Sequence, residues 1–452
     1  MIDPRVVVVG GGLAGIAASL ACVDAGARVT LIERRNQLGG LTRSFRHGDW
    51  ELDNGQHVFL RCCDAYLGLL ERLGARDEVT LQDRLSIPVL RPGGPTGWLR
   101  RRAGWPAPLH LGPSLARYPH IGLADRLRLG RAALPLARLD LHDPALDTET
   151  FGAWLARHGQ RPRSVEALWD LITLPTVNLR AAEASLAMAA KVFQTGLLTD
   201  APAADIGWSR VPLGHLHGRR AAQALGAARA AVLTDERVLH VDDDHGGAFR
   251  VQTERRVLHA DAVVVAVPHD AVATVLPEGV VEHQDRLAGL GHSAVVNVHL
   301  FYDRPVMRHD FAAAVDSPVE YVFDRSASAG VTSGQYLAVS LSGADALLGD
   351  RPDAVIDRIA AGVAELFPAA RSARVLDRLV TRERTATFRA VPGSGALRAG
   401  TTTARRGLVL AGAWTDTGWP ATMEGAVRSG RAAAREALIA TGRSRKLPEE
   451  VA

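Results

Sequence analysis

A glycine-rich turn near the N-terminus constrains this chain more than any other feature. The apolar run at residues 5–9 ends in three consecutive glycines, Gly10 to Gly12, and Gly15 follows. After an alanine- and leucine-rich stretch, a second apolar run at residues 29–32 closes on Glu33. This order predicts a strand, a tight turn, a helix and a second strand, which is the arrangement that holds a dinucleotide.

Each part of this motif has a mechanical role. Gly10 permits the tight turn, Gly12 lets the backbone approach a pyrophosphate, and Gly15 lets the helix pack close to the sheet. The free N–H groups and the dipole at the helix N-terminus favour the phosphates. Glu33 lies about twenty residues beyond the glycines, where a carboxylate can accept hydrogen bonds from ribose hydroxyls. We therefore expect a nucleotide-binding domain at the N-terminus.

The composition is that of an ordinary globular chain. Its 452 residues, 47% of them hydrophobic and 23% charged, suffice for two domains. No uninterrupted apolar stretch approaches the roughly 18 residues that a membrane-spanning helix needs. The first apolar run is the nucleotide strand itself, so no secretory signal is expected. Cys22, Cys62 and Cys63 are too few for a disulfide framework or a zinc site, which predicts a reducing cytoplasm and no bound metal.

Nearly all the positive charge is arginine, because only two of the 53 basic residues are lysines, Lys191 and Lys446. The net charge is a modest +4, and no basic run is interleaved with aromatic residues as in nucleic-acid-binding proteins. We therefore expect no nucleic-acid partner.

Residues 98–138 differ in character from the rest of the chain. Asp125 is the single acid in this stretch, tryptophans and leucines are mixed in, and eight positions are arginine: Arg100, Arg101, Arg102, Arg117, Arg126, Arg128, Arg131 and Arg138. One interpretation is a solvated helical hairpin. The other is a surface that lies on an anionic bilayer, because arginine beside tryptophan and leucine suits the membrane interface. The second would place a cytoplasmic protein peripherally on the inner face of the cytoplasmic membrane.

A second glycine pair, Gly39 and Gly40, follows Glu33, and a nicotinamide-dependent dehydrogenase has no need of it. Next comes the segment Asp53-Asn54-Gly55-Gln56-His57. This arrangement resembles the flavoprotein superfamily of amine oxidases, protoporphyrinogen oxidases and carotenoid desaturases. The resemblance implies that FAD is the cofactor, that the second glycine pair approaches its diphosphate, and that residues 54–57 run near the flavin ring.

Residues 408–430 carry a second specific motif, in which a strand delivers Gly412 and a helix begins near Thr422. The N–H groups of that helix can face the electron-rich side of a flavin ring. Together with residues 53–57, this motif resembles the bacterial hydroxysqualene dehydroxylases, also called squalene-associated FAD-dependent desaturases. The resemblance covers nearly the whole chain. It implies reduction of the apolar C30 isoprenoid hydroxysqualene to squalene, a step that supplies hopanoid synthesis.

The resemblance further implies an α/β fold, in which a Rossmann-like FAD-binding domain is interleaved with an α+β substrate domain. The FAD-binding domain is expected to comprise residues 1–85, 206–270 and 389–440. The substrate domain is expected to comprise residues 86–205, mainly helical, and 271–388. A flexible tail is expected at residues 441–452. Within the second FAD segment, the residues predict a loop over 208–214 and a helix over 221–231.

The resemblance also implies which residues contact FAD. They belong to the two glycine motifs and the residues beside them, to the segment near the ring, to an adenine contact and to the C-terminal motif: Gly10, Gly12, Ala14, Gly15, Glu33, Arg34, Gly39, Gly40, Leu41, Arg43, Gly55, Gln56, His57, Val238, Gly412, Thr422 and Met423. Two positions depart from the family pattern. Ala413 stands where an acid is usual, so either Asp416 compensates or this contact is lost. Leu41 stands where many members have a basic residue, and Arg43 is the expected substitute.

Loss of hydroxide from an allylic carbon calls for an acid, and four side chains are candidates: Asp53, His57, Asp416 and Glu424. His57 ranks first, because it falls in the segment expected near the ring and titrates close to neutrality. The alternative is that His57 only hydrogen-bonds the cofactor. Asp416 and Glu424 are better suited to helix capping or FAD contacts.

Two other enzymatic activities and one binding function are alternatives to dehydroxylation. Amine oxidation is disfavoured for two reasons. Thr422 stands where amine oxidases have a tyrosine of an aromatic cage. Those enzymes also usually keep a lysine that is hydrogen-bonded through water to the flavin N5, and neither Lys191, in a helical stretch, nor Lys446, in the tail, suits that role. Oxidative desaturation of a carotenoid or related polyene uses the same fold with electrons flowing the other way. A non-catalytic FAD- and lipid-binding partner is a third interpretation. The chain has no second dinucleotide fingerprint, so its electron donor is unknown.

Overall fold

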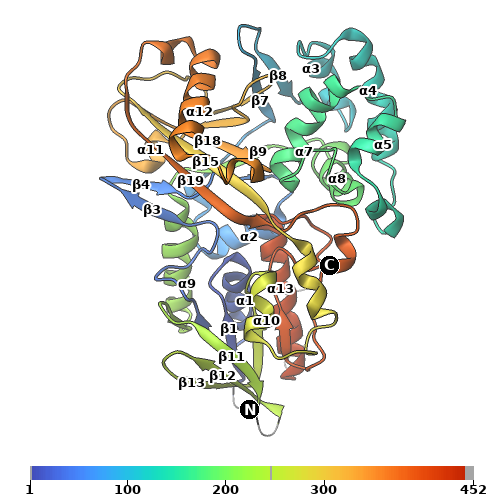
Figure 1. Cartoon of the computed structure of the whole chain (residues 1–452). Coiled ribbons are helices and arrows are strands. Elements are labelled where there is room, and N and C mark those ends of the chain that lie inside the picture. The colour runs from blue at the N-terminus through green and yellow to red at the C-terminus, as the bar shows by residue number, and fades with distance from the viewer. Residues whose placement is uncertain (1–2, 245–246, 443–452) are drawn as a thin grey trace.

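The computed structural model describes residues 3–244 and 247–442. Most of the predicted tail, residues 443–452, lies outside the described residues. Figure 1 shows two lobes, with the N-terminus and the long helix α13 (Met423–Ala440) in the lower one. The fold is α/β, as predicted, and the lower lobe is Rossmann-like.

A parallel sheet of five strands forms the centre of the lower lobe. In spatial order its strands are β10 (Ala231–Leu233), β2 (Arg28–Ile32), β1 (Arg5–Val9), β14 (Ala262–Val265) and β20 (Leu408–Leu410). Val6 to Val9 are at most 4% exposed, because helices or a second sheet cover both faces. The strands come from three distant stretches of the chain, as an interleaved architecture requires. The domain boundaries given above stay a prediction.

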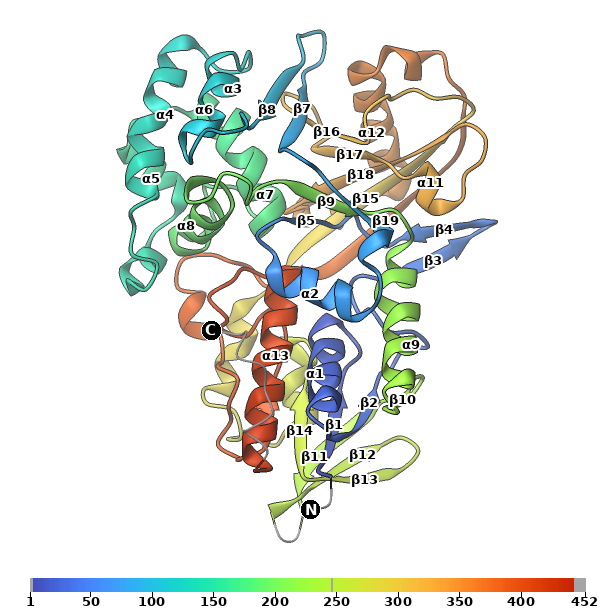
Figure 2. The ribbon, with the colours of Figure 1, turned by 180° about the vertical axis from the view of Figure 1, so that it is seen from behind.

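Helices α1 (Leu13–Asp24) and α13 pack against one another on one face of this sheet (Figures 1 and 2). Their contact is close because α13 has a glycine where it crosses α1. A Cβ atom on Gly430 would lie 2.1 Å from the carbonyl oxygen of Ala14. The opposite face carries the antiparallel sheet β11 (Val238–Asp243), β12 (Phe249–Thr253) and β13 (Val257–Ala260), with the short helix α10 (Val272–Val275).

The upper lobe is built on a seven-stranded sheet. In spatial order its strands are β19 (Val375–Thr387), β15 (Ser293–Tyr302), β18 (Gln335–Ser342), β17 (Tyr321–Asp324), β16 (Phe311–Ala314), β7 (Ser86–Leu90) and β8 (Gly97–Arg100). Helix α12 (Pro352–Leu366) packs on it (Figure 1), and α11 (Ser326–Ala329) follows β17 and contacts β18.

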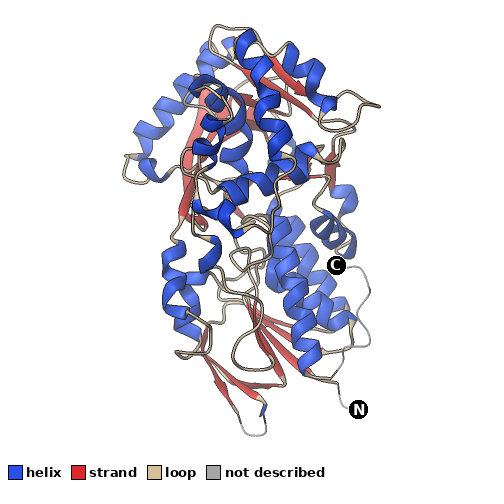
Figure 3. Ribbon diagram, turned by 90° about the vertical axis from the view of Figure 1, so that its right-hand side faces the viewer, coloured by secondary structure: helices blue, strands red, loops and turns tan. Residues whose placement is uncertain are grey.

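Short helices make up the other half of the upper lobe, as the sequence predicts. They lie together on the right of Figure 1, which is the side that faces the viewer in Figure 3. They are α3 (Gly112–Ala116), α4 (Leu123–Leu136), α5 (Phe151–Arg157), α6 (Pro162–Ser164), α7 (Asp170–Val177) and α8 (Leu186–Phe193). They enclose an apolar core that includes Phe151, Trp169 and Phe193. Among the residues that the structure describes, no helix is long and apolar enough to cross a bilayer.

The remaining elements connect the lobes. They are the hairpin β3 (Ser44–His47) and β4 (Trp50–Asp53), the helices α2 (Asp64–Arg72) and α9 (Arg220–Ala227), and the small sheet of β5 (Val58–Leu60), β9 (Ile206–Ser209) and β6 (Val79–Leu81). Two local predictions were wrong. Residues 208 and 209 belong to strand β9 and not to a loop, because β9 pairs with β5 and β6. The predicted helix over 221–231 ends at Ala227, since Arg229 adopts a left-handed conformation with φ 61° and β10 begins two residues later.

Candidate active site

The first glycine motif forms a turn between β1 and α1 that leaves open space beside one residue. Gly10 has φ 106°, and a Cβ atom there would lie 2.3 Å from the carbonyl oxygen of Ala266. A Cβ atom on Gly15 would lie 1.9 Å from the carbonyl oxygen of Gly10. At Gly12, however, the nearest atom to a Cβ would be the Cα of Gly40, 3.9 Å away. Packing thus requires Gly10 and Gly15, whereas Gly12 borders a cradle that fits the pyrophosphate of FAD.

The second glycine pair lies directly against the first motif. The amide of Gly39 donates to the carbonyl of Gly11 at 2.8 Å, and a Cβ atom on Gly40 would come within 2.8 Å of Gly12. Arg35 and Arg43 each donate from Nη1 to the carbonyl of Gly40 at 3.3 Å. Two guanidinium groups therefore lie where a diphosphate would need positive charge.

The other residues predicted to contact FAD near Gly39 and Gly40 differ in how exposed they are and in what they bind. Arg43 also pairs with Glu383 of β19 at 3.4 Å, which links the cradle to the upper lobe. Arg34 is exposed, and Leu41 is 39% exposed and brings no charge. Ala14 is buried in α1. Arg35, which was not singled out from the sequence, contacts the cradle through its hydrogen bond to Gly40.

Glu33 is buried at the end of β2 and holds the turn together. Its Oε2 accepts from the amide of Gly11 at 2.7 Å, and its Oε1 accepts from the amide of Arg35 at 2.9 Å. Each carboxylate oxygen keeps a second lone pair, so a ribose contact is compatible with this arrangement. The chain just before Val238 lies alongside, because the amide of Glu236 donates to the carbonyl of Glu33 at 3.1 Å. The structure thus brings the predicted ribose and adenine contacts together.

Asp53 is directed into the protein and not into the cradle. Its Oδ1 accepts from Ser44 Oγ at 2.7 Å and from the amide of Leu213 at 2.8 Å, and its Oδ2 faces Arg325 Nη2 at 3.2 Å. Burial raises the pKa of this carboxyl group, and the charge of Arg325 opposes that shift. Asp53 therefore fixes the hairpin β3–β4 to the segment that leads into α9.

His57 lies at the end of the loop between β4 and β5. Its Nδ1 donates to the carbonyl of Gly55 at 3.3 Å, and burial lowers its pKa from the usual value. A second histidine, His217, lies close enough for its charge to interact with that of His57. His217 is fully buried, its Nε2 lies 2.8 Å from Tyr66 Oη, and burial lowers its pKa to about 3.

Two buried side-chain amide atoms in the same region have no hydrogen-bond partner among the described residues. They are Gln56 Nε2 and Asn297 Oδ1. The amide of Asn297 donates from Nδ2 to the carbonyl of Asn54 at 3.1 Å, so the free oxygen lies at the segment expected near the ring. Since buried polar atoms are rarely left unsatisfied, these two fit the polar edge of a flavin. Together with the open space at Gly12, they make the residues present fit FAD.

The C-terminal motif folds as predicted, with Thr422 as the N-cap of α13. Its Oγ1 accepts from the amide of Gly425 at 3.1 Å, and Met423 is buried in the first turn. Gly412 follows β20, and its amide donates to Ser429 Oγ at 2.9 Å. Asp416 is exposed and accepts from the amide of Gly418 at 3.3 Å.

Glu424 caps a different helix from the one that it belongs to. Its oxygens accept from the amides of Ala65 at 3.1 Å and Tyr66 at 2.7 Å, in the first turn of α2. Arg428 donates to the same carboxylate at 2.6 Å. The side chain is 1% exposed. This is the capping role that the sequence favoured for it.

Arg398 holds the C-terminal loop and was missed from the sequence. Its guanidinium is buried and donates to the carbonyls of Trp414 at 3.1 Å and Trp419 at 2.8 Å, and also to that of Thr415. Burial lowers its pKa, while Asp416 raises it. An arginine in a loop carries no local signal for this role, which depends on carbonyls about twenty residues further along the chain.

Lys191 is indeed helical, but the structure brings it to the C-terminal motif. Its Nζ lies 5.0 Å from the centre of the Trp419 ring, and Arg428 lies over the same ring at 4.8 Å. Burial lowers the pKa of Lys191, and Arg428 lowers it further. Helix α8 of the upper lobe thus contacts the loop that is expected to flank the flavin.

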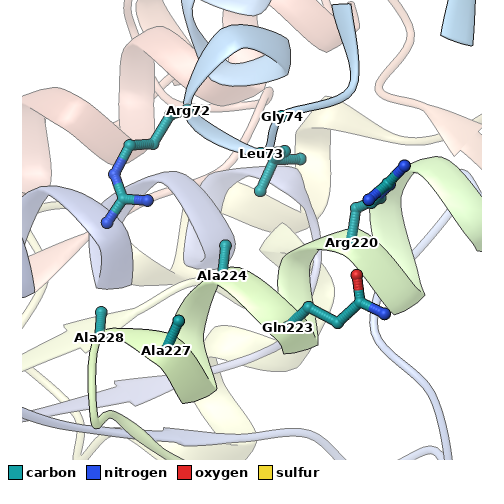
Figure 4. A pocket seen from close by; sticks show the side chains of 8 residues that line it. All are labelled: Arg72, Leu73, Gly74, Arg220, Gln223, Ala224, Ala227 and Ala228. Carbon is teal, nitrogen blue, oxygen red and sulfur yellow. The ribbon is translucent and has the colours of Figure 1, made fainter.

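A surface depression of about 490 Å³ lies elsewhere, between α2 and α9 (Figure 4). Its two arginines are already paired, Arg72 with Asp24 and Arg220 with Glu78. None of the predicted cofactor residues lines it. Among the residues described, no group of three or more histidine, cysteine or acidic side chains could hold a metal ion.

The nucleotide-binding sheet carries this double-glycine cradle, and a second lobe lies above it. This arrangement defines an FAD-dependent oxidoreductase. Residues 13–438 match the family described as flavin containing amine oxidoreductase, and the chain belongs to that family. It is 31% identical to a hydroxysqualene dehydroxylase of Rhodopseudomonas palustris, over 97% of this chain and 99% of that protein. It is 26% identical to a zeta-carotene desaturase of Synechocystis sp., over 96% of this chain and 97% of that protein.

The fold is also that of known flavoenzymes. The structure of cyclohexylamine oxidase from Brevibacterium oxydans superposes with a TM-score of 0.73 at 19% identity, over 98% of this chain and all of that one. The predicted family resemblance, the fold class and the FAD cofactor are therefore confirmed.

Proposed function

We propose that this protein reduces hydroxysqualene to squalene in an isoprenoid pathway that leads to hopanoids. The observation that carries the proposal is the near full-length similarity to a hydroxysqualene dehydroxylase. In the overall reaction a C–O bond breaks at an allylic carbon, a C–H bond forms there, and the hydroxyl leaves as water after taking up one proton. Reduced FAD, when bound, supplies the hydride.

The chain itself must hold the cofactor, exclude water and deliver the proton. The cradle at Gly12 and Gly40 and the guanidinium groups of Arg35 and Arg43 are proposed to bind the diphosphate. The remaining predicted FAD contacts stay proposals. Residues of the upper lobe contact the cradle and the segment expected near the ring, through Glu383 and Asn297, and these contacts support exclusion of water from a cation that forms at the allylic carbon.

His57 is the side chain that we propose as the acid. It lies in the segment expected near the ring, and its Nδ1 is the ring nitrogen that forms a hydrogen bond with a described residue. Asp53 accepts from three donors and Glu424 from three, while Asp416 is exposed. With Nδ1 donating to Gly55, Nε2 of His57 is left to hold the proton that assists the leaving hydroxyl.

Oxidative desaturation of a carotenoid or related polyene is the second candidate function. The similarity to a zeta-carotene desaturase supports it, at lower identity. The two differ in the redox state of the enzyme that reacts. Desaturation starts from oxidised enzyme and an unsaturated hydrocarbon, whereas dehydroxylation starts from reduced enzyme and an alcohol.

One experiment separates these possibilities. The purified holoenzyme is reduced without oxygen and mixed with hydroxysqualene, and the flavin spectrum and the hydrocarbon product are followed. We expect stoichiometric reoxidation and one squalene for each flavin. If reduced enzyme leaves hydroxysqualene untouched and oxidised enzyme desaturates a carotene, the second candidate is correct. If the protein is inert in both assays, a non-catalytic FAD- and lipid-binding partner is the better interpretation.

We also propose that the enzyme works at the cytoplasmic surface of a membrane, because a C30 hydrocarbon partitions into lipid. Its electron donor stays unidentified.

A further inference from the structure

Large apolar side chains are exposed together on one edge of the helical part of the upper lobe. The five are Trp105 (43% exposed), Leu109 (59%), Leu123 (68%), Leu127 (77%) and Leu134 (50%). Two of them precede α3, and three belong to α4. Helices α3 and α4 form the outer edge of this lobe in Figures 1 and 2. We call this group the apolar edge.

Helix α4 is apolar on two opposite sides. Leu129, Ala132 and Leu136 are buried in the core of the lobe. Leu123, Leu127 and Leu134 are spaced by four and seven residues, which places them in one row on the other side. A surface helix normally has a single apolar stripe, which faces the core. The outer row is therefore a second apolar stripe that the described chain leaves exposed.

The segment that carries this row also carries eight arginines, but fewer of them are available than its composition indicates. Four of the eight are engaged internally. Arg101 pairs with the buried Asp205 at 2.6 Å, Arg128 pairs with Asp125 at 3.3 Å, Arg126 donates to backbone carbonyls, and Arg100 stacks on Trp98 at 3.4 Å. The other four are exposed and form no ion pair with a described residue, although Arg102 lies over the Trp105 ring at 5.4 Å and Arg117 donates to the carbonyl of Pro113 at 3.2 Å. These four are Arg102, Arg117, Arg131 and Arg138. We call them the free arginines.

We propose that the apolar edge and the free arginines form a docking surface for an anionic lipid bilayer. Leucines and a tryptophan can enter the boundary between headgroups and acyl chains, while arginines beside them meet lipid phosphates. A second copy of this chain fits less well, because a symmetric contact would place the same four arginines of each copy opposite one another. The proposal rests on the proposed function, in that an enzyme for a C30 lipid has to meet its substrate in a membrane.

The docking surface connects to the catalytic region through a single apolar core. The buried side of α4 and the buried side of α8, including Leu186 and Phe193, belong to the same cluster. Lys191 of α8 in turn contacts Trp419 of the C-terminal motif. Docking at α4 would therefore place this core between the bilayer and the loop expected beside the flavin.

The test is flotation of the holoenzyme with two kinds of vesicle. One kind is phosphatidylcholine alone, and the other contains about 30% phosphatidylglycerol, which makes its surface anionic. Two double variants are compared with wild type, L127Q/L134Q and R131S/R138S. We expect each to weaken binding to anionic vesicles at least about tenfold, and high salt to weaken the binding of wild type. Control variants Leu376→Gln and Arg255→Ser, exposed on other elements, should bind like wild type. Retention of the flavin spectrum shows that each variant is folded.

The proposal is overturned if the double variants bind anionic vesicles as well as wild type does. It is also overturned if wild type does not bind anionic vesicles. A concentration-dependent dimer that L127Q/L134Q abolishes would replace the bilayer by a second copy. Turnover of detergent-dispersed hydroxysqualene keeps the two proposals apart, because the double variants should then react at the rate of wild type. If wild type floats with vesicles yet never converts hydroxysqualene, the docking surface stands and the proposed reaction fails.

Discussion

Gly12 and Gly40 face one another across the cofactor cradle, and their requirements differ. A Cβ atom on Gly40 would lie 2.8 Å from the Cα of Gly12, which is closer than packed atoms allow. A Cβ atom on Gly12 would lie 3.9 Å from its nearest neighbour, which is ordinary contact. Gly40 is thus required by the fold itself, whereas the space beside Gly12 is open, and we propose that it holds the pyrophosphate of FAD.

The variant Gly12→Val should therefore fold and lose FAD. Its added methyl groups would stand where the pyrophosphate has to approach. The measurement is the flavin absorbance of the purified protein, with circular dichroism as the test of folding. Gly226→Ala, in α9 with no atom within 4 Å of the added Cβ, is the matched control and should stay yellow. A full flavin spectrum in Gly12→Val would falsify the assignment of the cradle.

Removal of Arg325 should destabilise the protein strongly. The variant Arg325→Met leaves the buried Asp53 without its cation, and breaking a buried pair in this way costs about 3–5 kcal/mol. Urea unfolding followed by fluorescence gives the difference in the free energy of unfolding. Arg304→Met removes an exposed pair with Asp303 and should leave that free energy almost unchanged. Equal stability of the two variants would show that Asp53 needs no partner.

Replacement of His57 by alanine should slow the single turnover of reduced enzyme with hydroxysqualene, by roughly 100-fold if His57 is the general acid, while FAD stays bound. Burial lowers the pKa of His57, and an acid must be protonated to act. The rate of wild type should therefore rise as the pH falls through that lowered pKa, and the rise should be absent from His57→Ala. Unchanged turnover would transfer the role to Asp53 or Asp416.

Glu320 should make stability depend on pH. Burial raises its pKa from 4.5 to about 7, and the neighbouring Arg180 only partly offsets this. Because the folded state holds the proton more tightly than the unfolded state, the stabilisation is complete below about pH 4.5 and is lost as the pH rises through 7. The loss is on the order of 3 kcal/mol.

The variant Glu320→Gln cannot lose this proton, and its amide oxygen can still accept from Ser342. Its free energy of unfolding should fall less than that of wild type between pH 4.5 and pH 8. Parallel profiles for the two proteins would contradict the raised pKa.

Sequence reasoning succeeded where the signal is local. The spacing from Gly10 to Glu33 fixes a strand, a turn and a helix within a short stretch, so the motif could be located without a structure. The cap at Thr422 is local as well. Strand β9 was missed because its partners, β5 and β6, lie more than a hundred residues earlier in the chain. Arg398 and the contact of Lys191 with Trp419 likewise depend on segments that only the tertiary fold brings together.

In the arginine-rich segment, residues 98–138, composition alone was also insufficient to predict which side chains are exposed and unpaired. Its composition indicated positive charge, but not which side chains are used up inside the protein. Asp205, which binds Arg101 and Arg61, comes from more than a hundred residues further along the chain. The exposed leucines of α4 could not be told from its buried leucines until the packing of the helix was known.

The order in which the chain is synthesised determines when the three-part nucleotide sheet can be complete. Strand β20 and helix α13 complete the lower lobe, yet they are synthesised after every strand of the upper lobe. The first glycine turn emerges hundreds of residues before Gly412 and Thr422 can join it. A nascent chain consequently has no complete receptacle for the cofactor until β20 and α13 have been synthesised. The complete FAD cradle can therefore assemble only after the strands of the upper lobe have been synthesised.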